Sequence, residues 1–156
     1  MINFSGFNPI LDNINDLNLK KVIAFASRKN NKHEMAYFAY TIDGLEIQLT
    51  QYTSMLLYPT DPLEYFEPYY GSIQMSKFMP VASYGGIVNM DHLKNFEFLT
   101  YYQNPKYSKL VANFKNGLQV KMADFKTRNK EKYRQTLNHN TVKYRAWKEA
   151  NQVENF

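Results

Sequence analysis

The chain of 156 residues contains no cysteine and only three histidines. Without cysteine, a disulfide-stabilised scaffold, a thiolate zinc site and a cysteine nucleophile are all excluded. His33, His92 and His139 lie far apart and form no closely spaced pair, so they indicate neither a metal site nor a catalytic triad. No stretch approaches about 18 consecutive apolar residues, and the first residues lack the charged and apolar segments of a secretory signal. We therefore expect no membrane span, no cofactor and no enzymatic activity, and a location in the cytoplasm.

Apolar residues make up 44% of the chain and aromatic residues 16%, which is enough to form a true hydrophobic core. We expect a single β-rich domain over residues 1–137 and a helical tail over residues 138–156. The abundance of Asn, Lys, Tyr and Ile is typical of an A/T-rich coding sequence, and so of a low-GC bacterium, its plasmid or its phage.

The charges are distributed unevenly. Residues 1–100 carry seven basic and ten acidic groups, a net charge of −3, whereas residues 101–156 carry twelve and four, a net charge of +8. Residues 43–67 contain five acids and no Lys or Arg. Such a field attracts a polyanion to one end of the molecule and repels it from another.

Two hairpins are the clearest local predictions. A two-residue Asp43-Gly44 turn of type I′ pairs Tyr40 with Ile47 and places the apolar residues of both strands on one face. In the second hairpin the hydrophobic pattern favours a three-residue Lys115–Gly117 loop with a left-handed glycine. That register pairs Phe114 with Leu118, Ala112 with Val120 and Leu110 with Met122.

The remaining patterns predict further strands and short terminal helices. Strands are expected at residues 19–26, 87–89 and 96–102. Asn8-Pro9 and the apolar residues that follow predict a short N-terminal helix. From Asp124 the pattern turns helical, with a break near Asn138–Asn140 where Asn140 caps a second short helix. The fold class we expect is mainly β: a small, mostly antiparallel β domain with short N- and C-terminal helices.

The order of features over about residues 34–137 resembles the LytTR-type DNA-binding domain of bacterial response regulators. In that family short strands carry an Ile/Val-Val-Asn-x-Asp segment, a hairpin closed by Lys-Asn-Gly or Asp-Gly follows, and a basic stretch ends the domain. The matching segments here are Tyr70–Ile73, Lys77–Phe78, Ile87–Asn95, Phe114–Val120 and Lys126–Tyr133. Four features depart from the family. The insertion at Tyr101–Tyr107 and the C-terminal tail past Leu137 have no counterpart in it. Residues 79–86 lack its basic cluster, and Asp124 stands near the place of its arginine.

The resemblance implies non-catalytic binding of double-stranded DNA in transcriptional regulation, and it implies a homodimer because family members act as pairs on repeated sites. The residues expected to approach base edges are Ser83 and Tyr84. Phosphate contacts are expected from the basic C-terminal third, through Lys121, Lys126, Arg128, Lys130, Lys132, Arg134, Lys143 and Arg145. We also expect Tyr133, Tyr144 and Trp147, which lie among these residues in the sequence, to form part of a hydrated binding face.

Two other hypotheses remain open. The chain is also consistent with a small phage or mobile-element protein that binds and inhibits a host defence protein, using the acidic and aromatic residues 58–70 as its contact surface. An RNA-cutting toxin ranks third, because it needs little more than basic and polar groups around a phosphate.

Overall fold

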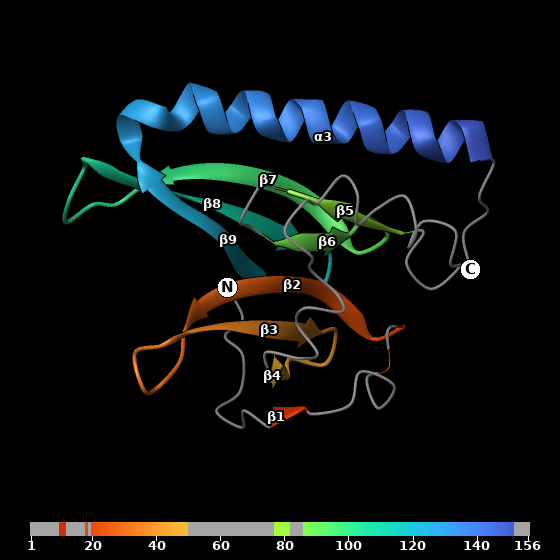
Figure 1. Cartoon of the computed structure of the whole chain (residues 1–156), viewed down its shortest axis with the longest axis horizontal. Coiled ribbons are helices and arrows are strands. Elements are labelled where there is room, and N and C mark those ends of the chain that lie inside the picture. The colour runs from red at the N-terminus through yellow and green to blue at the C-terminus, as the bar shows by residue number, and fades with distance from the viewer. Residues whose placement is uncertain (1–9, 12–17, 19, 50–76, 82–85, 152–156) are drawn as a thin grey trace.

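The computed structural model describes residues 10–11, 18, 20–49, 77–81 and 86–151, which form two β-sheets and one long helix (Figure 1). The larger sheet has six strands in the order β1-β4-β3-β2-β6-β5. They are β1 (Ile10–Leu11), β2 (Val22–Lys29), β3 (Met35–Thr41), β4 (Glu46–Leu49), β5 (Phe78–Pro80) and β6 (Ile87–Asn89). The two residues of β1 pair in parallel with β4, and every other pairing is antiparallel.

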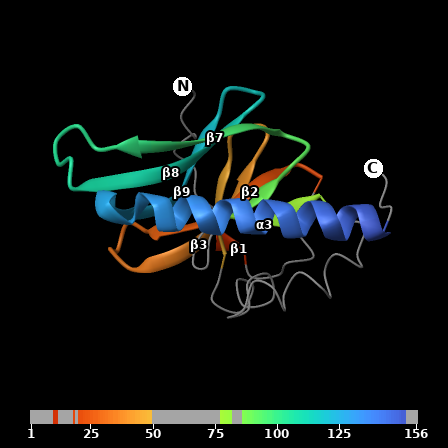
Figure 2. The same cartoon turned by 90° about the horizontal axis from the view of Figure 1, so that it is seen from above.

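The smaller sheet consists of β7 (Leu93–Thr100), β8 (Tyr107–Phe114) and β9 (Gln119–Lys126), paired antiparallel in that order. The chain then passes through a 3-10 turn, η2 (Thr127–Asn129), into α3 (Lys130–Asn151). In Figure 1 α3 lies along one side of the molecule, and in Figure 2, seen from above, it crosses in front of the strands. The predicted fold class, a mainly β and mostly antiparallel domain with a C-terminal helix, is confirmed.

The hydrophobic core runs through both sheets and the inner face of α3. Residues Val22–Ala26 of β2 are buried one after another, because this strand lies between β3 and β6 and is covered on both faces. In β8 the alternate residues Leu110, Ala112 and Phe114 belong to the same core cluster. The period of two in β8 agrees with the pattern from which its hairpin was predicted.

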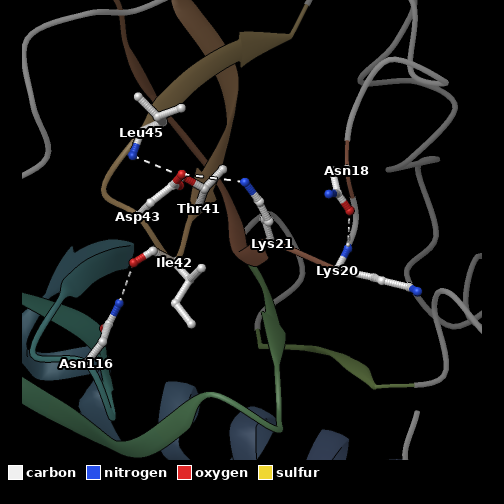
Figure 3. Close-up of polar contacts among 8 residues, drawn as sticks. All are labelled: Asn18, Lys20, Lys21, Thr41, Ile42, Asp43, Leu45 and Asn116. Carbon is white, nitrogen blue, oxygen red and sulfur yellow. Dashed lines mark hydrogen bonds and ion pairs between the residues drawn. The ribbon is translucent and has the colours of Figure 1, made fainter.

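The first hairpin forms where it was predicted, but its register differs by one residue. Tyr40 lies opposite Glu46 rather than Ile47, and the loop has three residues, closed by the bond from Thr41 N to Leu45 O at 3.0 Å. The Thr41 side chain explains the difference. Its hydroxyl accepts a bond from Leu45 N at 3.0 Å and donates one to Asp43 at 2.5 Å (Figure 3), while Gly44 takes up a positive φ of 87°. The type I′ turn was therefore wrong, and Glu46 faces the same side as Tyr40.

The second hairpin confirms the three-residue loop. Phe114 N donates to Leu118 O at 2.9 Å, Gly117 has a φ of 92°, and Ala112 lies opposite Val120. Beyond that pair a β-bulge shifts the register, so Leu110 lies opposite Ala123 instead of Met122. The turns of the two hairpins meet, since the Asn116 side chain donates to Ile42 O at 2.9 Å (Figure 3).

The C-terminal helix begins at Lys130 rather than near Asp124, because residues up to Lys126 belong to β9, and it continues without a break near Asn138–Asn140. The Tyr133 ring stacks on Phe125 of β9 with centroids 4.4 Å apart, and Leu137 and Tyr144 are buried on the same side of α3. The Asn140 side chain donates to Val81 O at 3.4 Å instead of capping a second helix. Packing along the whole helix thus outweighs the weak helix propensity of the Asn residues.

Two predictions at the ends of the chain need separate comment. Ile10–Leu11 form strand β1 where a helix was predicted, because they pair with Gln48 and Leu49, and the rest of the predicted N-terminal helix lies outside the described residues. The predicted boundary between residues 137 and 138 falls inside α3. No helix in the described ranges is long and apolar enough to cross a membrane.

A candidate nucleic-acid interface

The loop between β7 and β8 and the junction between β9 and α3 lie together at one end of the molecule, although they are about twenty residues apart in the sequence (Figures 1 and 2). Thr127 holds them together. Its backbone N–H donates to Lys106 O at 2.8 Å, and its hydroxyl donates to Pro105 O at 2.7 Å. Strand pairing adds to this contact by placing Tyr107 opposite Lys126.

This arrangement gathers five cationic residues, which we call the basic end: Lys106, Lys126, Arg128, Lys130 and Lys132. All are exposed except Lys130, which is half-buried. Within the described part of the chain none of the five forms an ion pair with a carboxylate. No carboxylate among the described residues therefore neutralises the charge of these five side chains.

The two acidic residues nearest in sequence to the basic end are neutralised by other partners. Asp124 accepts a bond from Lys121 at 2.5 Å and another from the Tyr101 hydroxyl. Burial and this bond to Asp124 raise the pKa of Tyr101 to about 12, so its proton remains in place at neutral pH. Glu131 pairs with Arg134 one turn along α3. Neither carboxylate thus cancels the charge of the five residues.

These pairings also change the role of two predicted contact residues. Lys121 is bound to Asp124 on the surface of the sheet. Arg134 is bound to Glu131, and its guanidinium lies 5.5 Å from the ring centroid of Phe98. Both side chains are engaged within the protein, so we leave them out of the basic end.

Lys143 and Arg145 are exposed, but they lie elsewhere. At a rise of 1.5 Å per residue, Lys143 is about 20 Å along α3 from Lys130. Two residues apart on a helix, Lys143 and Arg145 project to nearly opposite sides. Lys143 and Arg145 are therefore not part of the basic end, and the phosphate contacts predicted for them stay a prediction.

The aromatic residues expected on a hydrated face are mostly inside. Tyr144 is only 4% exposed, and Tyr133 is half-buried against Phe125. The side chain of Trp147 lies outside the described residues, as do Ser83, Tyr84 and the whole 58–70 segment. The base-reading role predicted for Ser83 and Tyr84 stays a prediction.

Sequence reasoning did not identify Lys106, because it lies in a turn outside the basic run. The β8–β9 register brings it to the basic end. If Ala112 pairs with Val120 and the two strands continue to pair, Tyr107 comes to lie beside Phe125 and Lys126. The sequence of the hairpin therefore already indicated that Lys106 lies close to Lys126.

A second charged group lies on the larger sheet and is satisfied internally. Arg28 donates to both carboxylate oxygens of Glu46, with the Nε bond at 2.9 Å, and its guanidinium lies 4.1 Å from the ring centroid of Phe38. Burial, with a further contribution from Glu46, raises the pKa of neighbouring Tyr40. Because both charges have partners, we interpret this group as structural.

Comparisons with models of protein families, with curated proteins and with solved structures give no match. Within the described ranges, no three His, Asp or Glu side chains are grouped so that they could hold a metal ion.

Proposed function

We propose that this protein binds double-stranded DNA without catalysing a reaction on it, and that the basic end is its phosphate-binding surface. Lys106, Lys126, Arg128, Lys130 and Lys132 then contact the DNA backbone and release counterions. The resemblance to LytTR-type domains makes transcriptional regulation in the cytoplasm the role that we propose for this binding.

The observation that carries the proposal is that two separate segments bring together cations that form no ion pair with any carboxylate of the described residues. Lys106 comes from the β7–β8 loop and the other four residues from the β9–α3 junction, and Thr127 fixes the two segments together with bonds of 2.8 and 2.7 Å. Charges held by a folded scaffold meet phosphates at a fixed spacing. If the lysines were only a solvated run on one helix face, a second segment would not need to be fixed beside them.

The electrostatic asymmetry of the chain supports the same proposal. The basic end belongs to the C-terminal third with its net charge of +8, whereas the acidic residues 43–67 belong to a part of net charge −3. A duplex approaching the molecule is attracted to the basic end and held away from the acidic part.

Two variants, each with two charge reversals, test the proposal when their DNA binding is compared. Lys126→Glu/Arg128→Glu changes the basic end, and Lys143→Glu/Arg145→Glu changes exposed residues on the second half of α3. In each variant two reversals of two units lower the formal net charge from +5 to +1. The measurement is fluorescence anisotropy with a labelled duplex at several salt concentrations.

We expect the first variant to bind about tenfold or more weakly than the unmodified protein, and the second to stay within about twofold of it. If both variants lose affinity for the duplex equally, binding depends only on net charge, and the basic end is not the phosphate-binding surface. If the unmodified protein fails to bind duplex DNA even at low salt, the proposal is wrong and inhibition of a host protein becomes the leading hypothesis.

A further inference from the structure

The loop of residues 101–106 projects from the basic end and exposes an unusual group of side chains. Tyr102 is 98% exposed, and Gln103, Asn104, Pro105 and Lys106 are all exposed as well. In Figures 1 and 2 this loop forms the extreme tip of the molecule, beyond the start of α3. An exposed aromatic ring and two amide side chains thus lie beside the phosphate-binding residues.

The base of this loop is held in place although its tip is exposed. Tyr101 N donates to Tyr107 O at 3.0 Å, and Tyr107 N donates to Asn104 O at the same distance. Thr127 binds the carbonyls of Pro105 and Lys106 from the other side. Lys109 Nζ lies 5.4 Å from the ring centroid of Tyr101 and packs against the start of the loop. A preorganised loop loses little conformational entropy when it binds.

The amide side chains at the tip have no hydrogen-bond partners among the described residues. Neither Gln103 nor Asn104 forms a side-chain hydrogen bond with any residue in the described part of the chain. Each offers a donor and an acceptor in one plane, which matches the N6 donor and N7 acceptor that adenine presents in the major groove. The methyl group of the paired thymine gives an apolar surface that suits the Tyr102 ring.

The β7–β8 hairpin is part of a three-stranded sheet, because Tyr107 at the start of β8 also pairs with Lys126 of β9, so the 101–106 loop is the part that projects beyond the strands. The major groove of B-DNA is about 12 Å wide and about 8.5 Å deep. If the tip of this loop enters the groove, Lys126 and Arg128 at its flank lie toward the phosphates that border the groove. Phosphate contacts and base contacts then come from neighbouring segments of one surface.

We infer that the 101–106 loop reads DNA sequence, with Gln103 and Asn104 pairing with adenine and Tyr102 packing on thymine methyl groups, so that the preferred sites are rich in A·T pairs at the contacted positions. This inference rests on the proposed function. It assigns base recognition to this loop in place of Ser83 and Tyr84.

The test begins with selection of bound sequences from a pool of randomised duplexes, using the full chain. The protein then binds the selected duplex and a scrambled duplex of the same length, and the ratio of the two affinities measures specificity. The variant is Gln103→Ala/Asn104→Ala. The matched control is Gln135→Ala/Asn138→Ala, which removes the same two residue types from exposed positions on α3.

The unmodified protein should select sites with A·T pairs. The loop variant should lose about a hundredfold or more in the affinity ratio, since it removes two amide–adenine contacts and each discriminates by about tenfold or more. Its affinity for the scrambled duplex should stay unchanged because the basic end is intact, and the control should retain the full ratio. Thermal unfolding of the loop variant should match that of the unmodified protein.

The outcomes separate this inference from the proposed function. Binding without a selected sequence, or a loop variant that keeps the full ratio, overturns the inference and leaves DNA binding in place. Absence of duplex binding by the unmodified protein overturns both. A selected site rich in G·C pairs also contradicts the assignment, because amide side chains are the partners of adenine.

Discussion

Gly86 marks the closest approach between β6 and the neighbouring strand, and Gly86→Ala should destabilise the protein strongly. A Cβ atom added there would lie 2.4 Å from the carbonyl oxygen of Phe25 and 2.3 Å from the Met122 sulfur. Methionine can move aside, but the Phe25 carbonyl belongs to β2, whose residue 25 pairs with Ile87 of β6. An ordinary C···O contact is about 3.3 Å or longer. The substitution therefore requires β6 to move by roughly 1 Å.

Overpacking of a buried site costs typically about 1–3 kcal/mol, and the rigid backbone partner places Gly86→Ala at the upper end, about 3 kcal/mol. For a chain of 156 residues, each kcal/mol corresponds to a change in Tm of about 2–4 °C, so we expect a decrease of roughly 6–12 °C. Circular dichroism during heating measures it. Gly44→Asn is the control, because Gly44 has a φ of 87° and a Cβ atom added there would meet no atom within 4 Å, and Asn tolerates the left-handed conformation.

The control should lower the Tm by no more than about 4 °C, corresponding to about 1 kcal/mol. If Gly86→Ala changes the Tm by less than about 2 °C, the close contact between β6 and β2 does not exist in the folded protein. The pairing of β6 with β2 described above would then need revision.

Two further predictions concern the attachment of α3. Burial, followed by the nearby Asp91 carboxylate, raises the pKa of Tyr144 to about 12, whereas tyrosine in the unfolded chain titrates near 10. The unfolded state therefore loses its proton first, and the free energy of unfolding should decline between about pH 10 and 12, less steeply in Tyr144→Phe. Equal declines in both proteins, measured by urea denaturation, would contradict this. Tyr133→Ala should remove the stacking on Phe125 and lower the free energy of unfolding by about 2 kcal/mol, whereas Tyr133→Phe should lower it far less. Similar decreases in the two variants would exclude the ring contact as the cause.

The hydrophobic pattern predicted the hairpin correctly where no side-chain hydrogen bond altered the turn. The Lys115–Gly117 loop was predicted because only that register keeps Phe114, Ala112 and Leu118 on one face. The same reasoning failed at Asp43-Gly44, since the Thr41 hydroxyl closes a three-residue loop there. Apolar periodicity contains no information about such a side-chain bond.

Tertiary contacts account for the other differences. The Asn residues at 138 and 140 predict a helix break, yet α3 continues because packing of Leu137 and Tyr144 offsets their low propensity. The basic run at residues 126–132 was visible in the sequence. Strand pairing brings Lys106 to this run, and side-chain geometry lets Lys121 bind Asp124. Composition alone could not separate the charges that remain free from those that have partners.

The salt dependence of duplex binding tests the central proposal most directly. If the five cations of the basic end each neutralise one phosphate, log K should decrease with log salt with a slope of about −4.5. Neutralising two of them in Lys126→Gln/Arg128→Gln should make the slope shallower by about 2. A slope near zero for the unmodified protein, or an unchanged slope in the variant, would contradict the proposal that this surface binds DNA phosphates.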